Sequence, residues 1–136
     1  MVCGAVSGRP RADVTIAQRD PEAASQQAFK RAWVAAGIDA APSGPRVATH
    51  FDAARLAATV SGAAVTTEAA AEAFGLGFLP LEQHTVEIWL ADGSRDHPGA
   101  QALTDLLNGT RFTERIKHIG AYDLTGCGGL VSGAEG

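Results

Sequence analysis

The chain has 136 residues, of which 46% are hydrophobic and 19% are charged, and its formal net charge is −4. This balance and length are typical of one soluble globular domain with a single buried core. They exclude a disordered chain, a membrane-spanning protein and a basic nucleic-acid-binding protein, so we expect neither a nucleic-acid partner nor a membrane partner.

Cysteine usage and the N-terminal residues narrow the class of protein further. The two cysteines, Cys3 and Cys127, lie far apart and form no CxxC pair. This spacing excludes a disulfide scaffold and a zinc ribbon. The first ten residues lack a basic start followed by a long apolar run, so we expect no secretory signal and a cytoplasmic location.

The first strand and helix are expected after a loose, flexible N-terminus at residues 1–12. Residues 13–18 are rich in β-branched side chains and predict a short strand. Asp20 can cap a helix whose first position is Pro21. We expect this helix to continue until Gly37, a residue type that commonly follows a helix C-terminus.

Two more strand–helix pairs follow a loop rich in proline, glycine and serine. Their expected elements are, in chain order, a strand over 46–49, a helix over 53–60, a strand over 63–66 and a helix over 68–74. Thr49 or Asp52 can cap the first of these helices, and Thr67 can cap the second. A glycine follows each helix, which supports these ends.

The C-terminal half predicts two strands and then two helices. The expected elements are, in chain order, strands over 78–81 and 85–90 and helices over 98–108 and 111–119. Apolar residues alternate along the second strand, as in a strand with one buried face. Pro80 argues against a central position for the first strand. Thr110 is the expected cap of the last helix, and Gly120 is its expected end.

This order of elements predicts the α/β class, with a three-layer arrangement of a mostly parallel sheet flanked by helices. Ligands of such sheets bind outside the carboxyl ends of the strands, near helix N-termini. Three strand-to-helix junctions therefore contain the candidate ligand-binding residues, which are Ser25, Gln26, Thr49, His50, Thr66, Thr67 and Glu68. The alternative is that these residues serve only as helix caps.

No catalytic or metal-binding constellation is recognisable in the sequence. The four histidines have no metal-ligand spacing, so we expect no metal and no cofactor. Cys127 lies in a glycine-rich stretch, and a hydrolase that uses Cys127 or His50 is a further alternative. Because no nucleophile, base and orienting group can be assembled, we expect that the chain is not an enzyme.

Four segments of the C-terminal half resemble a known family. They are residues 74–82, 86–90, 97–107 and 120–128. They are similar to the periplasmic-binding-protein-like (type II) ligand-binding domains, and in particular to a cytoplasmic group related to molybdate-binding proteins. Members of that group are often fused to a helix-turn-helix or excisionase-type DNA-binding domain.

The resemblance implies two α/β lobes that clamp a ligand between them. In this chain it implies one ligand-binding domain over 13–128, followed by a flexible tail at 129–136. Lobe II would span about 13–80, and the returning strands and C-terminal helices about 81–128. Most of lobe I would be missing, so the chain resembles a truncated member of the family.

The family's ligand contacts come from the same three junctions. The first usually has the sequence Gly-Ser-Gly-Thr-Arg, whereas residues 22–26 here lack the glycines and the arginine and keep one hydroxyl, at Ser25. The second usually has Thr-His after a strand, which Thr49 and His50 match. At the third, residues 66–68 stand where relatives often place a different polar residue.

The resemblance implies a non-enzymatic module that senses or binds a small molecule, either a molybdate-like oxyanion or a small polar metabolite. The alternative is a ligand-free remnant or protein-interaction module that forms a homo-oligomer through the exposed face of the lobe. In that case a second copy, or a partner that supplies the missing lobe, would complete it.

Overall fold

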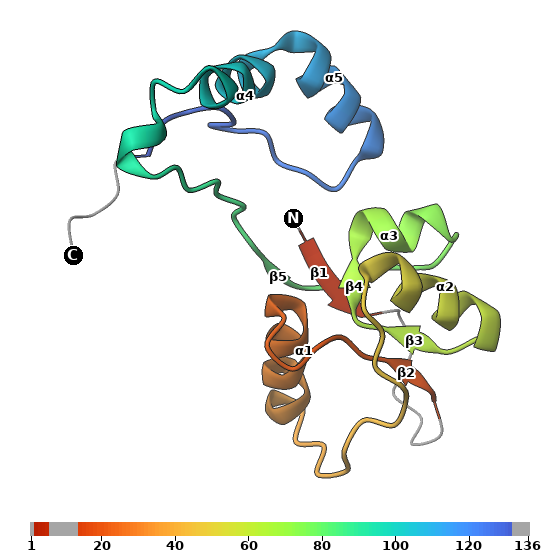
Figure 1. Ribbon diagram of the computed structural model, residues 1–136. Coiled ribbons are helices and arrows are strands. Elements are labelled where there is room, and N and C mark those ends of the chain that lie inside the picture. The colour runs from red at the N-terminus through yellow and green to blue at the C-terminus, as the bar shows by residue number, and fades with distance from the viewer. Residues whose placement is uncertain (1, 6–13, 132–136) are drawn as a thin grey trace. The chain divides into compact units, whose positions relative to one another are not determined.

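The computed structural model describes residues 2–5 and 14–131 and divides the chain into two compact units (Figure 1). The first unit is Met1–Thr85 and the second is Val86–Gly136. The sequence predicted one domain over 13–128 with lobe II at about 13–80, and this organisation stays a prediction. Residues 6–12 of the predicted loose start and residues 132–136 of the predicted tail lie outside the described residues.

The described residues of the first unit form five short strands in two sheets. The strands are β1 (Val2–Ala5), β2 (Ile16–Ala17), β3 (Ala63–Ala64), β4 (Thr66–Thr67) and β5 (Leu79–Gln83). One sheet has the order β4-β1-β5 with antiparallel pairing, and the other pairs β2 with β3 in parallel. The predicted strand over 46–49 is reduced to one parallel bridge between Gln18 and Arg46.

The two sheets join through the segment that contains β3 and β4. Only Val65 separates these strands, and its N–H donates to the carbonyl oxygen of Ala17 over 2.9 Å. Since β1 runs antiparallel to both β4 and β5, those two strands point the same way. Among the described strands, β1 alone is reversed.

The prediction of a mostly parallel sheet is therefore wrong for the pairing in the larger sheet. The cause is β1, which lies between β4 and β5 although the sequence predicted a loose start there. A strand of four residues that includes Gly4 is too short to show an alternating pattern, and glycine disfavours strands. β5 lies at an edge of its sheet, which confirms the expectation from Pro80.

Three helices cover the sheets of the first unit: α1 (Ala24–Ala35), α2 (His50–Val60) and α3 (Glu68–Ala73). The predicted start of α1 at Pro21 is wrong by three residues. Asp20 forms a turn instead, because its Oδ1 accepts from Glu22 N over 2.9 Å and its carbonyl oxygen accepts from Ala23 N over 3.0 Å. Thr49 and Thr67 cap α2 and α3 as predicted.

Helices α1 and α2 pack against opposite sides of the β2–β3 region. Ile16 and Val65 pack with Phe29 of α1, whereas their strand neighbours Ala17 and Ala64 pack with alanines of α2. This division follows from the alternation of side chains along a strand. Alanine makes up most of the buried apolar residues among the described part of the chain, so α2 and α3 lie close to the strands.

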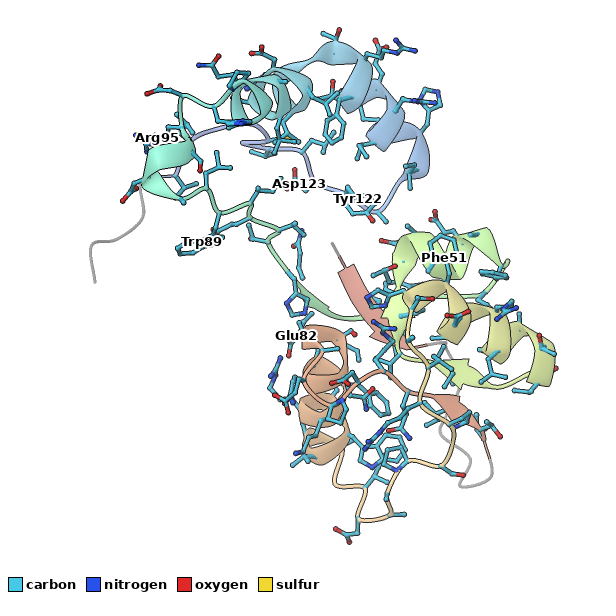
Figure 2. All side chains as sticks on the ribbon, viewed as in Figure 1. Phe51, Glu82, Trp89, Arg95, Tyr122 and Asp123 are labelled. Carbon is cyan, nitrogen blue, oxygen red and sulfur yellow. The ribbon has the colours of Figure 1, made fainter. Side chains whose placement is uncertain are left out.

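An ion pair fastens α1 to β5 through Glu82, which Figure 2 labels. Arg31 donates from Nε and from its terminal nitrogen to the two carboxylate oxygens of Glu82, each over 2.7 Å. This bidentate geometry is the strongest arrangement of an arginine with a carboxylate. The hydrogen bonds hold the pKa of Glu82 below its usual value and raise that of Arg31.

The second unit contains a short 3₁₀ helix η1 (Asp92–Ser94) and the helices α4 (Pro98–Asn108) and α5 (Thr110–Ile119). Helix α4 matches its predicted range and α5 begins one residue earlier than predicted, and Gly120 ends α5 in a left-handed conformation with φ of 70°. The predicted cap at Thr110 is wrong, because Gly109 occupies the cap position and no side chain bonds there. No helix within 14–131 is both long and apolar enough to cross a membrane.

The predicted strand over 85–90 does not form. Residues 85–90 belong to no strand, and Val86 and Trp89 are 69% and 83% exposed. Figure 2 shows the Trp89 side chain projecting from this connecting segment. Alternating apolar residues form a strand only where a neighbouring strand supplies backbone hydrogen bonds, and none of the described strands pairs with this segment.

Candidate functional site

The three predicted junctions of the first unit lie at one edge of its strands. They follow β2, the bridge residue Arg46, and β4, and these three segments point the same way. Hydrogen bonds connect the junctions to one another. The hydroxyl of Thr66 donates to the carbonyl oxygen of His50 over 2.9 Å, and Arg19 donates from its guanidinium to the carbonyl oxygen of Val47 over 3.3 Å. The edge is therefore one connected surface.

Arg19 is the cation of this edge. It directly follows the Gln18 bridge, and its positive charge contributes to the lowered pKa values of both His50 and Asp52. Its Nε is buried and has no hydrogen-bond partner among the described residues. Arg19 was not among the residues that the sequence predicted for the site. A cation directly after a strand that leads to a helix is the signal that could have identified it.

His50 is the first residue of α2 and is partly buried. Burial lowers the pKa of its imidazole, and the charge of Arg19 lowers it further. The ring is therefore neutral at neutral pH and carries one N–H donor and one acceptor nitrogen. Its Nδ1 is buried without a hydrogen-bond partner in the described part of the chain.

Ser25 lies in the first turn of α1 and is only 4% exposed. Its Oγ also has no hydrogen-bond partner within residues 14–131. Buried polar atoms in proteins are nearly always hydrogen-bonded, so an unpartnered buried donor indicates a position where a ligand could accept a hydrogen bond. Arg19, Ser25 and His50 each contribute one such atom to this edge.

Three of the other predicted residues use their polar atoms within the fold. Gln26 accepts from Arg19 N over 2.8 Å and donates to the side chain of Gln18 over 3.2 Å. Thr66 is fully buried and bonded to His50, and Thr67 accepts from Ala70 N over 3.4 Å as the cap of α3. These bonds hold the three junctions in place.

Thr49 and Glu68 complete the predicted set. The hydroxyl of Thr49 accepts from Asp52 N over 3.0 Å and donates to Asp52 Oδ2 over 2.7 Å. Glu68 is the first residue of α3 and forms no ion pair with a described residue. Its carboxylate adds a negative charge at the third junction.

Comparison with known protein families identifies the family of this chain. The family model described as the PBP superfamily domain matches residues 7–108. The chain belongs to the PBP superfamily. No curated protein and no solved structure matches it significantly. Domains of this superfamily bind small molecules and are generally not enzymes.

The PBP match includes all three junctions and reaches the end of α4. It therefore covers the edge that contains Arg19, Ser25 and His50. It supports the α/β class and the resemblance to periplasmic binding proteins that the sequence predicted.

A surface hollow lies beside the second junction of the PBP domain. Its volume is about 350 Å³, and its lining includes Val47, Asp52 and Arg55. Arg55 pairs with Asp52 over 3.0 Å, so the charges in this hollow largely neutralise each other. None of the seven predicted site residues lines it.

The groups named for enzymatic and metal chemistry are not assembled into a centre. Cys127 lies in the second unit, and the partner of its thiol within residues 14–131 is the carbonyl oxygen of Leu107, at 3.7 Å. Among residues 14–131, no three His, Cys, Asp or Glu side chains are close enough together to hold a metal ion.

Proposed function

We propose that the first unit is a non-enzymatic module that binds a small oxyanion or another small polar anion at the edge formed by Arg19, Ser25 and His50. The observation that carries the proposal is that each of these residues buries a polar atom without a hydrogen-bond partner in the described chain. An anion would accept from the guanidinium, the hydroxyl and the imidazole N–H together. Membership of a superfamily of small-molecule-binding domains favours the same function.

The N-termini of α1 and α2 strengthen this proposal. The partial positive charge of a helix N-terminus favours an anion, and the lengths of both helices allow a full effect. Thr49 and residues 66–68 would orient the site rather than supply most of its free donors. We also propose that the unit is a three-layer lobe of the type II class and that the protein acts as a cytoplasmic sensor, as in the molybdate-related group that the sequence resembles.

Thermal unfolding with candidate anions tests the proposal. The full chain is melted alone and with molybdate, tungstate, sulfate or phosphate. A ligand that binds the native state at about 100 times its Kd adds about 2.7 kcal/mol of stability. We expect a shift with at least one anion. The absence of any shift, together with no heat of binding by calorimetry, would contradict an oxyanion site.

Two variants locate the binding site. Ser25→Ala removes an Oγ that has no partner in the described fold. It should therefore leave the melting temperature without ligand nearly unchanged and lower the affinity for the anion by about tenfold. Arg19→Gln should abolish the response. Ser94→Ala, in the second unit, is the matched control and should bind as the parent does. Equal affinities of the parent and Ser25→Ala would place the ligand elsewhere.

A second candidate function is homo-oligomerisation. No residue of α4 or α5 is buried, and Leu106 and Ile119 are 55% and 49% exposed. Helices that bury so little apolar surface within their own chain usually bury more of it against a partner. Light scattering of the purified chain tests this: a dimer that Leu106→Gln converts to a monomer would support it, and a monomer at all concentrations would exclude it.

A further inference from the structure

A second hollow lies between α1 and the loop at residues 37–46. Its volume is about 270 Å³. Its apolar lining comes from Phe29, Trp33, Pro21 and Pro42. The rings of Phe29 and Trp33 lie 5.3 Å apart between centroids and are tilted by 49°, so they form a continuous aromatic wall. We call this hollow the aromatic slot.

Hydrogen bonds to β2 and α1 hold the loop side of the aromatic slot in place. The indole N–H of Trp33 donates to the carbonyl oxygen of Ala40 over 2.9 Å. Ile16 N donates to the carbonyl oxygen of Ser43 over 2.7 Å, and Gln18 Nε2 donates to that of Pro42 over 3.1 Å. The slot is therefore formed before any ligand arrives, which reduces the entropy that binding must overcome.

Gln18 and Gln26 line the floor of the aromatic slot, and their side-chain amides are already hydrogen-bonded. Gln26 Nε2 donates to Gln18 Oε1, and Gln26 Oε1 accepts from the backbone of Arg19. A ligand therefore meets an apolar wall and a floor whose polar atoms are already bonded. Specific polar contacts have to come from the rim.

The rim of the aromatic slot is positively charged. Lys30 and Arg46 line it, both are exposed, and neither forms an ion pair with a described residue. The neighbouring Arg31, by contrast, is paired with Glu82. No carboxylate is among the lining residues. The charge at this rim favours an anionic group on a ligand whose body is apolar.

We propose that the aromatic slot binds a small carboxylate with a single aromatic ring. The ring packs against Phe29 and Trp33, and the carboxylate is directed to Lys30 and Arg46. Ligand pockets usually have volumes of about 300–1,000 Å³, and this hollow, at about 270 Å³, is slightly smaller, so it suits one ring with a short side chain. This site is separate from the anion site proposed at Arg19, because its lining includes none of Arg19, Ser25 or His50.

Tryptophan fluorescence with phenylacetate tests this proposal. The chain has two tryptophans, and Trp89 is 83% exposed in the other unit, so Trp89→Phe leaves Trp33 as a single reporter at little structural risk. We expect a saturable change in Trp33 emission with phenylacetate and a matching heat of binding by calorimetry. The neutral isostere phenylacetamide should bind several-fold more weakly.

Charge removal at the rim completes the test. Lys30→Gln and Arg46→Gln should each lower the affinity for phenylacetate by roughly threefold to fivefold. Lys117→Gln on α5 is the matched control, and Ser25→Ala should also leave phenylacetate affinity unchanged. A missing response in both fluorescence and calorimetry would overturn the proposal. Equal affinity for phenylacetamide, or unchanged affinity in both rim variants, would also overturn it.

Discussion

The hydroxyl of Thr66 donates to the carbonyl oxygen of His50 over 2.9 Å and so ties β4 to the first residue of α2. Thr66 is fully buried. Thr66→Val keeps the shape of the side chain but leaves the His50 carbonyl without this donor. We expect a loss of about 1–3 kcal/mol in the free energy of unfolding. Urea denaturation measures it, and Thr66→Ser, which keeps the hydroxyl, should lose less. Equal losses in the two variants would show that the bond is unimportant.

Gly44 is required by a close approach between the loop and β2. Its φ is +144°, and a Cβ there would lie 2.1 Å from the carbonyl oxygen of Ile16. Gly44→Ala should therefore destabilise the first unit strongly and open the aromatic slot. Gly37→Ala is the matched control, because Gly37 also has a positive φ but has nothing within 4 Å of its Cβ position. Thermal melts that rank Gly37→Ala as the worse variant would contradict this account.

His50 should make stability depend on pH in the mildly acidic range. Burial and then the charge of Arg19 lower the pKa of His50 in the folded state, so the unfolded chain binds this proton more readily. The contribution of neutral His50 is fully present above an unfolded pKa of about 6.5 and is lost as the pH falls toward the folded pKa. The stability difference between the parent and His50→Gln should be constant above pH 7 and change below it.

Nuclear magnetic resonance titration of the histidine rings checks the same prediction directly. The other three histidines are common to both proteins, so the difference between the two stability curves isolates His50. A folded His50 pKa above the unfolded value would reverse the expected sign and contradict its burial beside Arg19.

Asp52 should also make stability depend on pH, at lower pH than His50 does. As is usual for a carboxylate, the stability falls as the pH falls. The Thr49 hydroxyl is the main cause of its lowered pKa, and Arg55 and Arg19 add to it. Its stabilising contribution is present above an unfolded pKa of about 3.9 and is lost as the pH falls through the lower folded pKa. Thr49→Val should raise the Asp52 pKa in a carboxyl titration. An unchanged value would remove the hydroxyl as the cause.

Most helix ends were predicted well because their signals are local; the start of α1 and the cap of α5 are the exceptions. Thr49, the Pro98 start and Gly120 act within a few residues of the boundary that they set. Strands were predicted less well, because each needs a partner distant in sequence. β1 forms between β4 and β5 despite a weak pattern, while the clear alternation over 85–90 finds no strand among those described.

The candidate site was likewise predicted in part, where the information is local in sequence. Strand-to-helix order was enough to bring the three junctions to one edge. It did not reveal which polar atoms the fold uses itself, since that depends on contacts between junctions, as with Thr66 and His50. Arg19 could have been identified from its place directly after a strand, whereas its unpartnered Nε is a property of packing that the sequence does not reveal.

The alanine-built core of the first unit also affects how stability varies with temperature. Ala53, Ala57 and Ala64 are completely or almost completely buried, yet each removes little apolar area from water. The heat capacity of unfolding grows with the apolar area that unfolding exposes, and is about 12–15 cal/mol/K per residue in ordinary domains. This chain should fall below that range, so its stability curve is flat and broad and changes little over a wide span of temperatures.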